Sequence, residues 1–203
     1  MTTSSFTPMR TIITSYIDGQ WQAAGALLLP VINPATEEVV AQLSEADARE
    51  TAAAVAAAQA SWKSGIWARK SAADKRRVFQ RIVALTLEHI EELAQLECLN
   101  SGLPLNYLRA RQLPRITRNF DFFADWLSQN VEKAGMTDQD YLRFVLREPA
   151  GVAALIAPWN APLALASTKI AAALAFGNSC VILVPRSRCF FVTSMPGKED
   201  LMH

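Results

Sequence analysis

A strand-helix-strand pattern in the last quarter of the sequence constrains the fold most. Residues 151–157 form an apolar run typical of a strand buried on both faces, and residues 158–162 form a turn. A helix is expected over 163–176, followed by a Gly-Asn stop and a second buried strand over 179–184. Strands joined in this way run parallel with a right-handed crossover, so the unit begins a doubly wound sheet.

The first 130 residues carry mostly helical patterns, in which apolar residues recur three and four positions apart. Ser44, with Asp47 three residues on, is a candidate cap for the first helix. Ser71, followed by Asp74, is the corresponding start of the second, and Gly102 ends the third. The expected helices run from Ser44 to Trp62, from Ser71 through Leu85, from Ile90 through Leu96 and from Pro114 through Leu127.

Short β-prone segments surround these helices. An Asp-Gly pair between β-prone residues predicts a hairpin over 16–21, since glycine accepts the positive φ of a tight turn. A further strand is expected at 39–43, whereas residues 1–15 are expected to form a loose lead-in. Residues 141–148 are bulky and β-prone, and they predict a long strand that leaves the helical region.

Charge and cysteine usage exclude several classes of function. Lys and Arg number 20 against 19 Asp and Glu, so the chain has no net field to attract nucleic acid or an anionic membrane. Cys98, Cys180 and Cys189 show no disulfide or zinc-binding spacing, and no stretch approaches the ~20 apolar residues of a membrane helix. We therefore expect a cytoplasmic protein with a small-molecule partner and no metal.

The turn at residues 157–162 is the expected ligand site, because open parallel sheets bind ligands beyond the carboxyl ends of their strands. The turn contains neither a GxGxxG run nor a Walker lysine, which excludes the usual glycine-cradled pyrophosphate site there. A nucleotide bound at this turn must therefore be held in another way.

A series of consecutive motifs resembles the aldehyde dehydrogenase superfamily. The matching motifs are Arg147-Glu148-Pro149-Ala150-Gly151-Val152, Ile156 to Leu163, Lys169-Ile170-Ala171 and Ala175-Phe176-Gly177-Asn178-Ser179. Earlier segments agree in order and spacing, namely Tyr16 to Trp21, Ile32 to Thr36 and Glu97 to Pro104. The resemblance covers residues 16–183. It implies the N-terminal part of an NAD(P)-binding α/β domain: a helical portion around an incomplete, doubly wound (Rossmann-like) parallel sheet, with 141–148 as a bridging strand.

The same resemblance assigns roles to the turn, with NAD or NADP as the implied cofactor. Cofactor contacts in the family lie at the positions that match Ile156, Ala157, Pro158, Trp159 and Asn160. The family's asparagine at Asn160 also donates its side-chain amide to the oxyanion of the thiohemiacetal intermediate, a catalytic contribution of ~3 kcal/mol for a well placed donor. The alternative is that Asn160 caps the following helix. Lys169 resembles the family's helix lysine, but taken alone it is a solvated charge.

The chain departs from the family near its second buried strand. Leu183 and Val184 stand where the family has a Lys-Pro pair, whose lysine reaches the adenosine ribose. Residues 184–203 resemble nothing in the family, so we expect a truncated N-terminal portion with an unrelated tail. Cys98 and Cys180 fall in a helix and a buried strand, and neither matches the family's nucleophilic cysteine; the general-base glutamate also has no match. The chain is therefore expected to be inactive alone.

Two functions remain open at this point. The first is the activity of the family, NAD(P)-dependent oxidation of an aldehyde or semialdehyde to a carboxylic acid. The second is a non-catalytic remnant that binds nucleotide weakly, or that associates with an intact paralogue through residues 141–148. A homo-oligomer is a further expected form of the chain.

Overall fold

The structure, a computed structural model, describes residues 11–129, 134–136 and 141–183. It opens with five strands, β1 (Ile12–Ile13), β2 (Tyr16–Ile17), β3 (Gln20–Trp21), β4 (Leu28–Ile32) and β5 (Val39–Ser44). One small sheet has the order β1-β5-β4, and β2 pairs with β3 as the predicted hairpin. Asp18 and Gly19 at the hairpin turn both have positive φ, which confirms the reason for expecting a tight turn there.

Helices form most of the remaining described chain: α1 (Ala48–Ser64), α2 (Ala72–Glu88), α3 (Ile90–Ser101), α4 (Leu105–Tyr107), the π-helical η1 (Leu108–Gln112), α5 (Leu113–Gln129) and α6 (Pro162–Ala175). The Ser71 hydroxyl caps α2 by accepting the backbone N–H of Asp74. Gly102 ends α3 in the left-handed conformation at φ 72°. Both ends are as the sequence predicts.

The predicted strand-helix-strand unit is confirmed. It consists of β8 (Val152–Ile156), α6 and β9 (Ser179–Leu183), and the two strands pair in parallel from Val152↔Ser179 to Ile156↔Leu183. Asn178 closes the unit, because its Oδ1 accepts the Gly151 backbone N–H at 3.0 Å while its Nδ2 donates to Ala173 O at 3.2 Å. One side chain thus ties the start of β8 to the end of α6.

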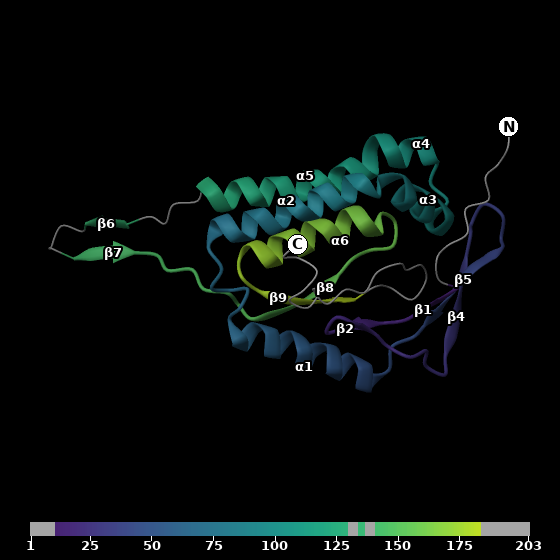
Figure 1. Cartoon of the computed structure of the whole chain (residues 1–203), viewed down its shortest axis with the longest axis horizontal. Helices are drawn as coiled ribbons and strands as arrows, with labels where there is room; N and C mark the ends of the chain where they lie inside the picture. The colour runs from purple at the N-terminus through teal and green to yellow at the C-terminus, as the bar shows by residue number, and fades with distance from the viewer. Residues whose placement is uncertain (1–10, 130–133, 137–140, 184–203) are drawn as a thin grey trace.

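Helices cover both sides of the β8–β9 pair, which gives the α/β layering predicted from the sequence (Figure 1). α1 contacts one face of the pair, and α6 covers the other. α5 packs on α6, and α2 packs on α5, so three helices are stacked on one side. The carboxyl end of β8 leads directly into the turn that precedes α6, and this turn is the expected ligand site.

The main hydrophobic core lies between the sheet and these helices. Phe79 of α2 is 0% exposed and contacts Phe120 of α5 edge to face, with ring centroids 5.4 Å apart. Trp67 also stacks on Phe79, with ring centroids 6.4 Å apart, and its indole N–H donates to Leu174 O at 2.8 Å. Aromatic packing therefore joins α2, α5 and α6 into one body.

Two expectations for the N-terminal part are wrong. Ser44 does not cap the first helix, because it pairs with Leu28 at the end of the β4–β5 ladder; Asp47 caps α1 instead, accepting Glu50 N–H at 2.7 Å. The lead-in is also not loose throughout, because β1 pairs in parallel with β5 and the side chains of Ile13 and Thr14 are buried. Residues 1–10 lie outside the described residues.

The long strand expected at 141–148 is a short one, β7 (Leu142–Phe144), which pairs antiparallel with β6 (Ala134–Met136). Residues 145–148 are not assigned to a strand, so the described strand ends at Phe144. β8 also differs from the expectation of burial on both faces: Leu155 is buried, but Ile156 is 62% exposed. β9 is buried from Ser179 to Ile182, because α1 covers it more fully than it covers β8.

None of the helices in the described part of the chain has the length and hydropathy needed to cross a membrane. The longest of them, α1, α2 and α5, each have 17 residues and carry charged side chains along their exposed faces.

Phe79→Ala is expected to lower the free energy of unfolding by about 3–5 kcal/mol, because it leaves a cavity between Trp67 and Phe120. Urea denaturation followed by circular dichroism measures this loss. Phe122→Ala is the matched control, since this ring on α5 is 62% exposed, and its effect should stay below about 1 kcal/mol. Equal losses for the two variants would contradict the position of Phe79 in the core.

Candidate functional site

The turn between β8 and α6 is buried at its ends and exposed in the middle. Ala157 and Ala161 are 3% and 4% exposed, whereas Pro158, Trp159 and Asn160 between them are exposed. The two small buried residues hold the turn against the body of the protein. The turn therefore presents an aromatic ring and a carboxamide to solvent at the carboxyl end of a parallel strand, where open α/β sheets bind ligands.

Asn160 does not cap α6. The N-cap residue is Ala161, which has extended φ and no side chain that can accept a hydrogen bond, and Pro162 follows in the first turn. The carboxamide of Asn160 makes no hydrogen bond among the described residues, so its amide donors are free to meet a ligand. The capping alternative is thereby excluded, and the catalytic role of Asn160 stays a prediction.

Lys169 ties α6 to the end of β8. Its Nζ donates to the backbone carbonyl of Ile156 at 2.6 Å, one residue before the turn. Lys169 is exposed, as the sequence pattern predicts for a solvated charge, and the structure adds that its ammonium group also reaches across to the strand. The carbonyl at the end of a strand needs a donor once the ladder stops, and Lys169 supplies it.

Glu97 of α3 is a buried carboxyl group near the start of α6. Its side chain is 5% exposed, and the backbone N–H of Leu163, in the first turn of α6, is the polar group that acts on its pKa. Burial raises the pKa of Glu97 from 4.5 to about 7, and the hydrogen bond from Leu163 opposes this shift in part. A carboxyl group that changes its charge near neutral pH thus lies directly behind the turn.

Asn119 of α5 is a third support for the same helix turn. Its Nδ2 lies 3.1 Å from Ala164 O, 2.9 Å from Ser167 Oγ and 2.8 Å from Thr168 Oγ1. These distances place one amide group against the first two turns of α6. Asn119 therefore holds the beginning of α6 through a side chain that comes from another helix.

Neither of these two supporting residues is among those predicted from the sequence. A signal for Glu97 exists there, because it shares the buried face of α3 with Ala94 and Asn100 at intervals of three residues. A carboxylate on such a face needs a partner and so marks a functional or structural site. Asn119 gives no comparable signal, because it is an uncharged polar residue between Arg118 and Phe120 in a helix that carries many polar side chains.

One of the two described thiols, Cys180, is poorly suited to nucleophilic attack. Cys180 in β9 is buried, and burial raises the pKa of its thiol to about 11, which disfavours the reactive thiolate. Cys98 is half-buried on α3, and Cys189 lies outside the described residues. In the described ranges there is also no group of His, Cys, Asp and Glu side chains that can hold a metal ion.

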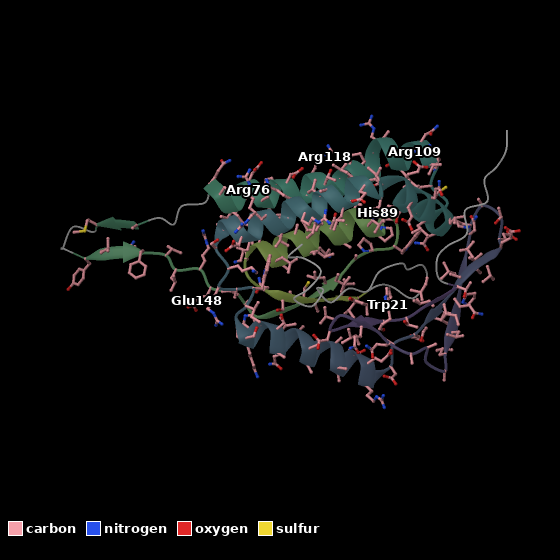
Figure 2. All side chains as sticks on the ribbon, viewed as in Figure 1. Trp21, Arg76, His89, Arg109, Arg118 and Glu148 are labelled. Carbon is pink, nitrogen blue, oxygen red and sulfur yellow. The ribbon has the colours of Figure 1, made fainter. Side chains whose placement is uncertain are left out.

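A surface groove occurs elsewhere, at the junction of α4, η1 and α5. Its lining residues are Tyr107, Arg111, Gln112, Arg115 and Arg118. Figure 2 shows Arg118 on the outer side of the helical layer, away from β8 and β9. None of the site residues predicted from the sequence lies in this groove, so the turn and the groove are separate features.

Comparisons with known proteins agree with this fold. The sequence matches the Aldehyde dehydrogenase family over residues 21–192, which extends past residue 183, the expected end of the resemblance. It is 36% identical to the mitochondrial aldehyde dehydrogenase family 2 member B4 of Arabidopsis thaliana, over 79% of this chain and 30% of that protein. It is 34% identical to the aminoacetaldehyde dehydrogenase of Pseudomonas aeruginosa, over 83% of this chain and 34% of that protein.

Solved structures give the same result. The NAD+ complex of an aldehyde dehydrogenase from Bacillus cereus has a TM-score of 0.79 and 36% identity, covering 84% of this chain and 35% of that one. An indole-3-acetaldehyde dehydrogenase of P. syringae, in complex with NAD+ and IAA, has a TM-score of 0.79 and 32% identity, covering 83% of this chain and 34% of that one. The chain spans about a third of the length of the relatives that it matches.

The buried carboxyl group makes stability depend on pH. Because the pKa of Glu97 is raised from 4.5 to about 7 on folding, the folded state binds more protons than the unfolded state in this interval. The free energy of unfolding is therefore expected to fall as pH rises through this range, by about 3 kcal/mol for this group. Urea denaturation at a series of pH values between about 5 and 8 measures the slope.

Glu97→Gln should flatten this dependence, because the amide does not titrate, whereas Glu88→Gln, on an exposed acid at the end of α2, should leave it unchanged. An unfolding free energy that rises with pH in this window would contradict the burial of Glu97. An equal slope in the wild type and Glu97→Gln would contradict it as well.

Proposed function

Because the chain belongs to the aldehyde dehydrogenase family, as its motifs predict, we propose that it forms one wall of a site for the NAD(P)-dependent oxidation of an aldehyde or semialdehyde to a carboxylic acid. The observation that carries the proposal is the turn after β8, which presents the Asn160 carboxamide beside Trp159 at the carboxyl end of a parallel strand. Both residues are at the positions that the family's motifs assign to the site.

Asn160 supplies electrostatic stabilisation in this proposal. When a thiolate adds to an aldehyde carbonyl, negative charge develops on the oxygen, and an N–H donor held at that place lowers the barrier. The carboxamide of Asn160 is neutral and does not titrate, so its donor capacity is the same at every physiological pH. The helix that follows adds its positive end near the same place, which favours the developing anion.

The residues around the turn fit the nicotinamide end of a dinucleotide better than the adenosine end. Ile156 and Trp159 are 62% and 50% exposed, and they offer apolar surface on which a flat ring can lie. Leu183 at the end of β9 stands where the family has its ribose-contacting lysine, so this chain lacks that cation. When bound, the cofactor supplies the hydride acceptor; we infer that this chain binds it weakly.

The described thiols set a limit on the chemistry of the chain by itself. Cys180 lies inside the sheet with a raised pKa, and Cys98 lies on α3, whose neighbouring residue Glu97 points into the protein. The raised pKa makes Cys180 unsuited to attack an aldehyde held at Asn160. We therefore infer that residues 156–160 position the aldehyde and stabilise its oxyanion, and that the covalent step uses a thiol other than Cys180.

NAD+ titration followed by NMR tests the nucleotide part of the proposal. We expect NAD+ to shift the backbone amide signals of residues 156–160 with weak affinity. Leu183→Lys restores a cation beside the strand end and should tighten binding by about 10- to 100-fold, the value of a charge-assisted hydrogen bond. Leu87→Lys is the control, since it adds the same charge at an exposed position of α2 and should leave binding unchanged.

The two outcomes that contradict the proposal are distinct. Absence of any NAD+-dependent shift at residues 156–160, in the wild type and in Leu183→Lys, would remove the nucleotide site. An equal gain in affinity for Leu183→Lys and Leu87→Lys would show that the added charge acts through general attraction and not through a site at the strand end.

A second candidate function, association with another chain, rests on the arm formed by β6 and β7. Figure 1 shows the arm projecting beyond the ends of α2 and α5. Its large apolar side chains are 50–71% exposed: Met136, Tyr141, Leu142, Phe144, Val145 and Leu146. Both strands also have an edge with no ladder partner among the described residues. Exposed apolar side chains on an open strand edge are typical of an interaction surface.

Replacing arm residues should weaken self-association. We expect Leu142→Lys combined with Phe144→Lys to shift the chain toward the monomer in sedimentation velocity, because the two added charges would be buried in an interface. Val55→Lys combined with Leu87→Lys is the control, since it adds two charges at exposed apolar positions on α1 and α2. Association that is unchanged by the arm variant would assign the interface to another surface.

A further inference from the structure

The groove at the junction of α4, η1 and α5 concentrates positive charge on the outer side of the helical layer (Figure 2). Its volume of about 510 Å³ lies within the range of about 300–1,000 Å³ that is typical of small-molecule sites. Arg111, Arg115 and Arg118 line it, and none of the described residues in its lining is acidic. The sequence accounts for this charge, because residues 98–120 contain four arginines and no Asp or Glu, in a chain whose formal net charge is only +1.

The π-helical segment η1 shapes one side of the groove. Its wider turn brings residues five positions apart onto one face, and the Nε2 of Gln112 accordingly donates to the Tyr107 hydroxyl at 3.2 Å. The Oε1 atom of Gln112 is buried and has no hydrogen-bond partner among the described residues. A buried acceptor of this kind needs a donor, and π-helical turns within helices are frequent at functional sites. The groove therefore combines an unused acceptor with its arginine side chains.

The guanidinium groups in the groove have few acceptors of their own. Arg111 and Arg115 are exposed and make no hydrogen bond or ion pair with the part of the chain that the structure describes. Arg118 donates through its Nε to Pro114 O at 3.1 Å, and no described residue accepts from its two terminal nitrogens. Positive charges gathered in one groove repel one another, and an anion placed between them removes the repulsion. The unused donors and the repulsion both indicate an anionic ligand.

The positive surface is limited in extent. Arg109, which precedes the groove arginines in the chain, pairs with Glu91 of α3, and Asp125, which follows them on α5, pairs with Arg76 of α2. The neighbouring cations are thus neutralised, and the three groove arginines lie within a span of eight residues. A nucleic acid or a membrane surface needs a wider basic face than this, so the groove favours a small ligand.

We propose that this groove is a binding site for a small molecule that carries a phosphate or carboxylate group, held by the guanidinium forks of Arg111, Arg115 and Arg118. A guanidinium group suits both because its parallel N–H donors meet two oxygen atoms at once. The ring of Tyr107 is 44% exposed and offers a surface for the remainder of the ligand. The site goes beyond the proposed function and does not depend on it, because the groove contains none of residues 156–160.

NMR titration of the 15N-labelled chain with inorganic phosphate, and separately with succinate, tests the proposal. We expect saturable shifts of the Nε–Hε signals of the three groove arginines and of the side-chain amide of Gln112. Sodium chloride at the same ionic strength is the parallel titration, because it screens charges in a general way without filling a site. The anion that binds more tightly identifies the group that the groove prefers.

Arg115→Gln should weaken binding by about 10- to 100-fold, the value of a charge-assisted hydrogen bond. Arg115→Lys keeps the charge but loses the fork, so it should still weaken binding by about 10-fold. Arg49→Gln is the control and should leave binding unchanged, because Arg49 is exposed on α1, which covers the other face of the β8–β9 pair. Both arginines are exposed, so the variants should keep the fold, which circular dichroism checks.

Saturable shifts that weaken in both Arg115 variants and persist in Arg49→Gln support the site. Absence of shifts with both anions would overturn it, and so would shifts that sodium chloride reproduces. Equal losses in Arg115→Gln and Arg49→Gln would overturn it as well, because attraction by the net charge would then account for the binding. Undiminished binding by Arg115→Lys would overturn recognition through the guanidinium fork.

Discussion

The parallel ladder between β8 and β9 is the interaction on which the rest of the structure depends. Parallel neighbours require a crossover, and the crossover must place α6 on one face of the pair with its N-terminus at the carboxyl end of β8. Asn178 completes this geometry by joining Gly151 to Ala173, so the ladder and the helix end are fixed by one side chain. The exposed turn is then a consequence of topology.

The features that could be predicted from the sequence are those decided by neighbouring residues. Ser71 and Gly102 mark helix ends because a hydroxyl cap and a left-handed glycine act within one helical turn. The Asp-Gly hairpin is local in the same sense. The capping role expected of Ser44 is wrong because its partner, Leu28, lies in another strand, and the ladder outweighs its capping preference. The strand β1 was expected to be part of a loose lead-in for the same reason, because its partner β5 comes about thirty residues later.

The candidate site also contains residues that neighbouring sequence can locate and residues that only the packing of distant elements can locate. Trp159 and Asn160 lie in a contiguous motif, so the resemblance to the family is enough to locate them. Glu97 and Asn119 belong to α3 and α5, and they meet α6 only through the packing of helices distant in sequence. The sequence pattern makes Lys169 a solvated charge because helical periodicity describes its own helix and does not reveal the carbonyl of Ile156 across the crossover. Contacts between a side chain and an element distant in sequence follow from the packing of the fold, and local sequence patterns do not specify that packing.

The connection from β8 into α6 has a physical cost that residues outside the helix offset. Ala161 at the N-cap has no side-chain acceptor, and Pro162 has no backbone N–H, so the start of α6 lacks a side-chain cap of its own. Asn119 of α5 places its amide against the first two turns of α6, and Lys169 donates to the carbonyl of Ile156 at the end of β8. These contacts hold the two elements on either side of the turn, while the turn itself is held by the buried Ala157 and Ala161. The burial of Ala161 and the exposure of Asn160 are therefore consequences of one constraint, a tight connection from a parallel strand into a helix.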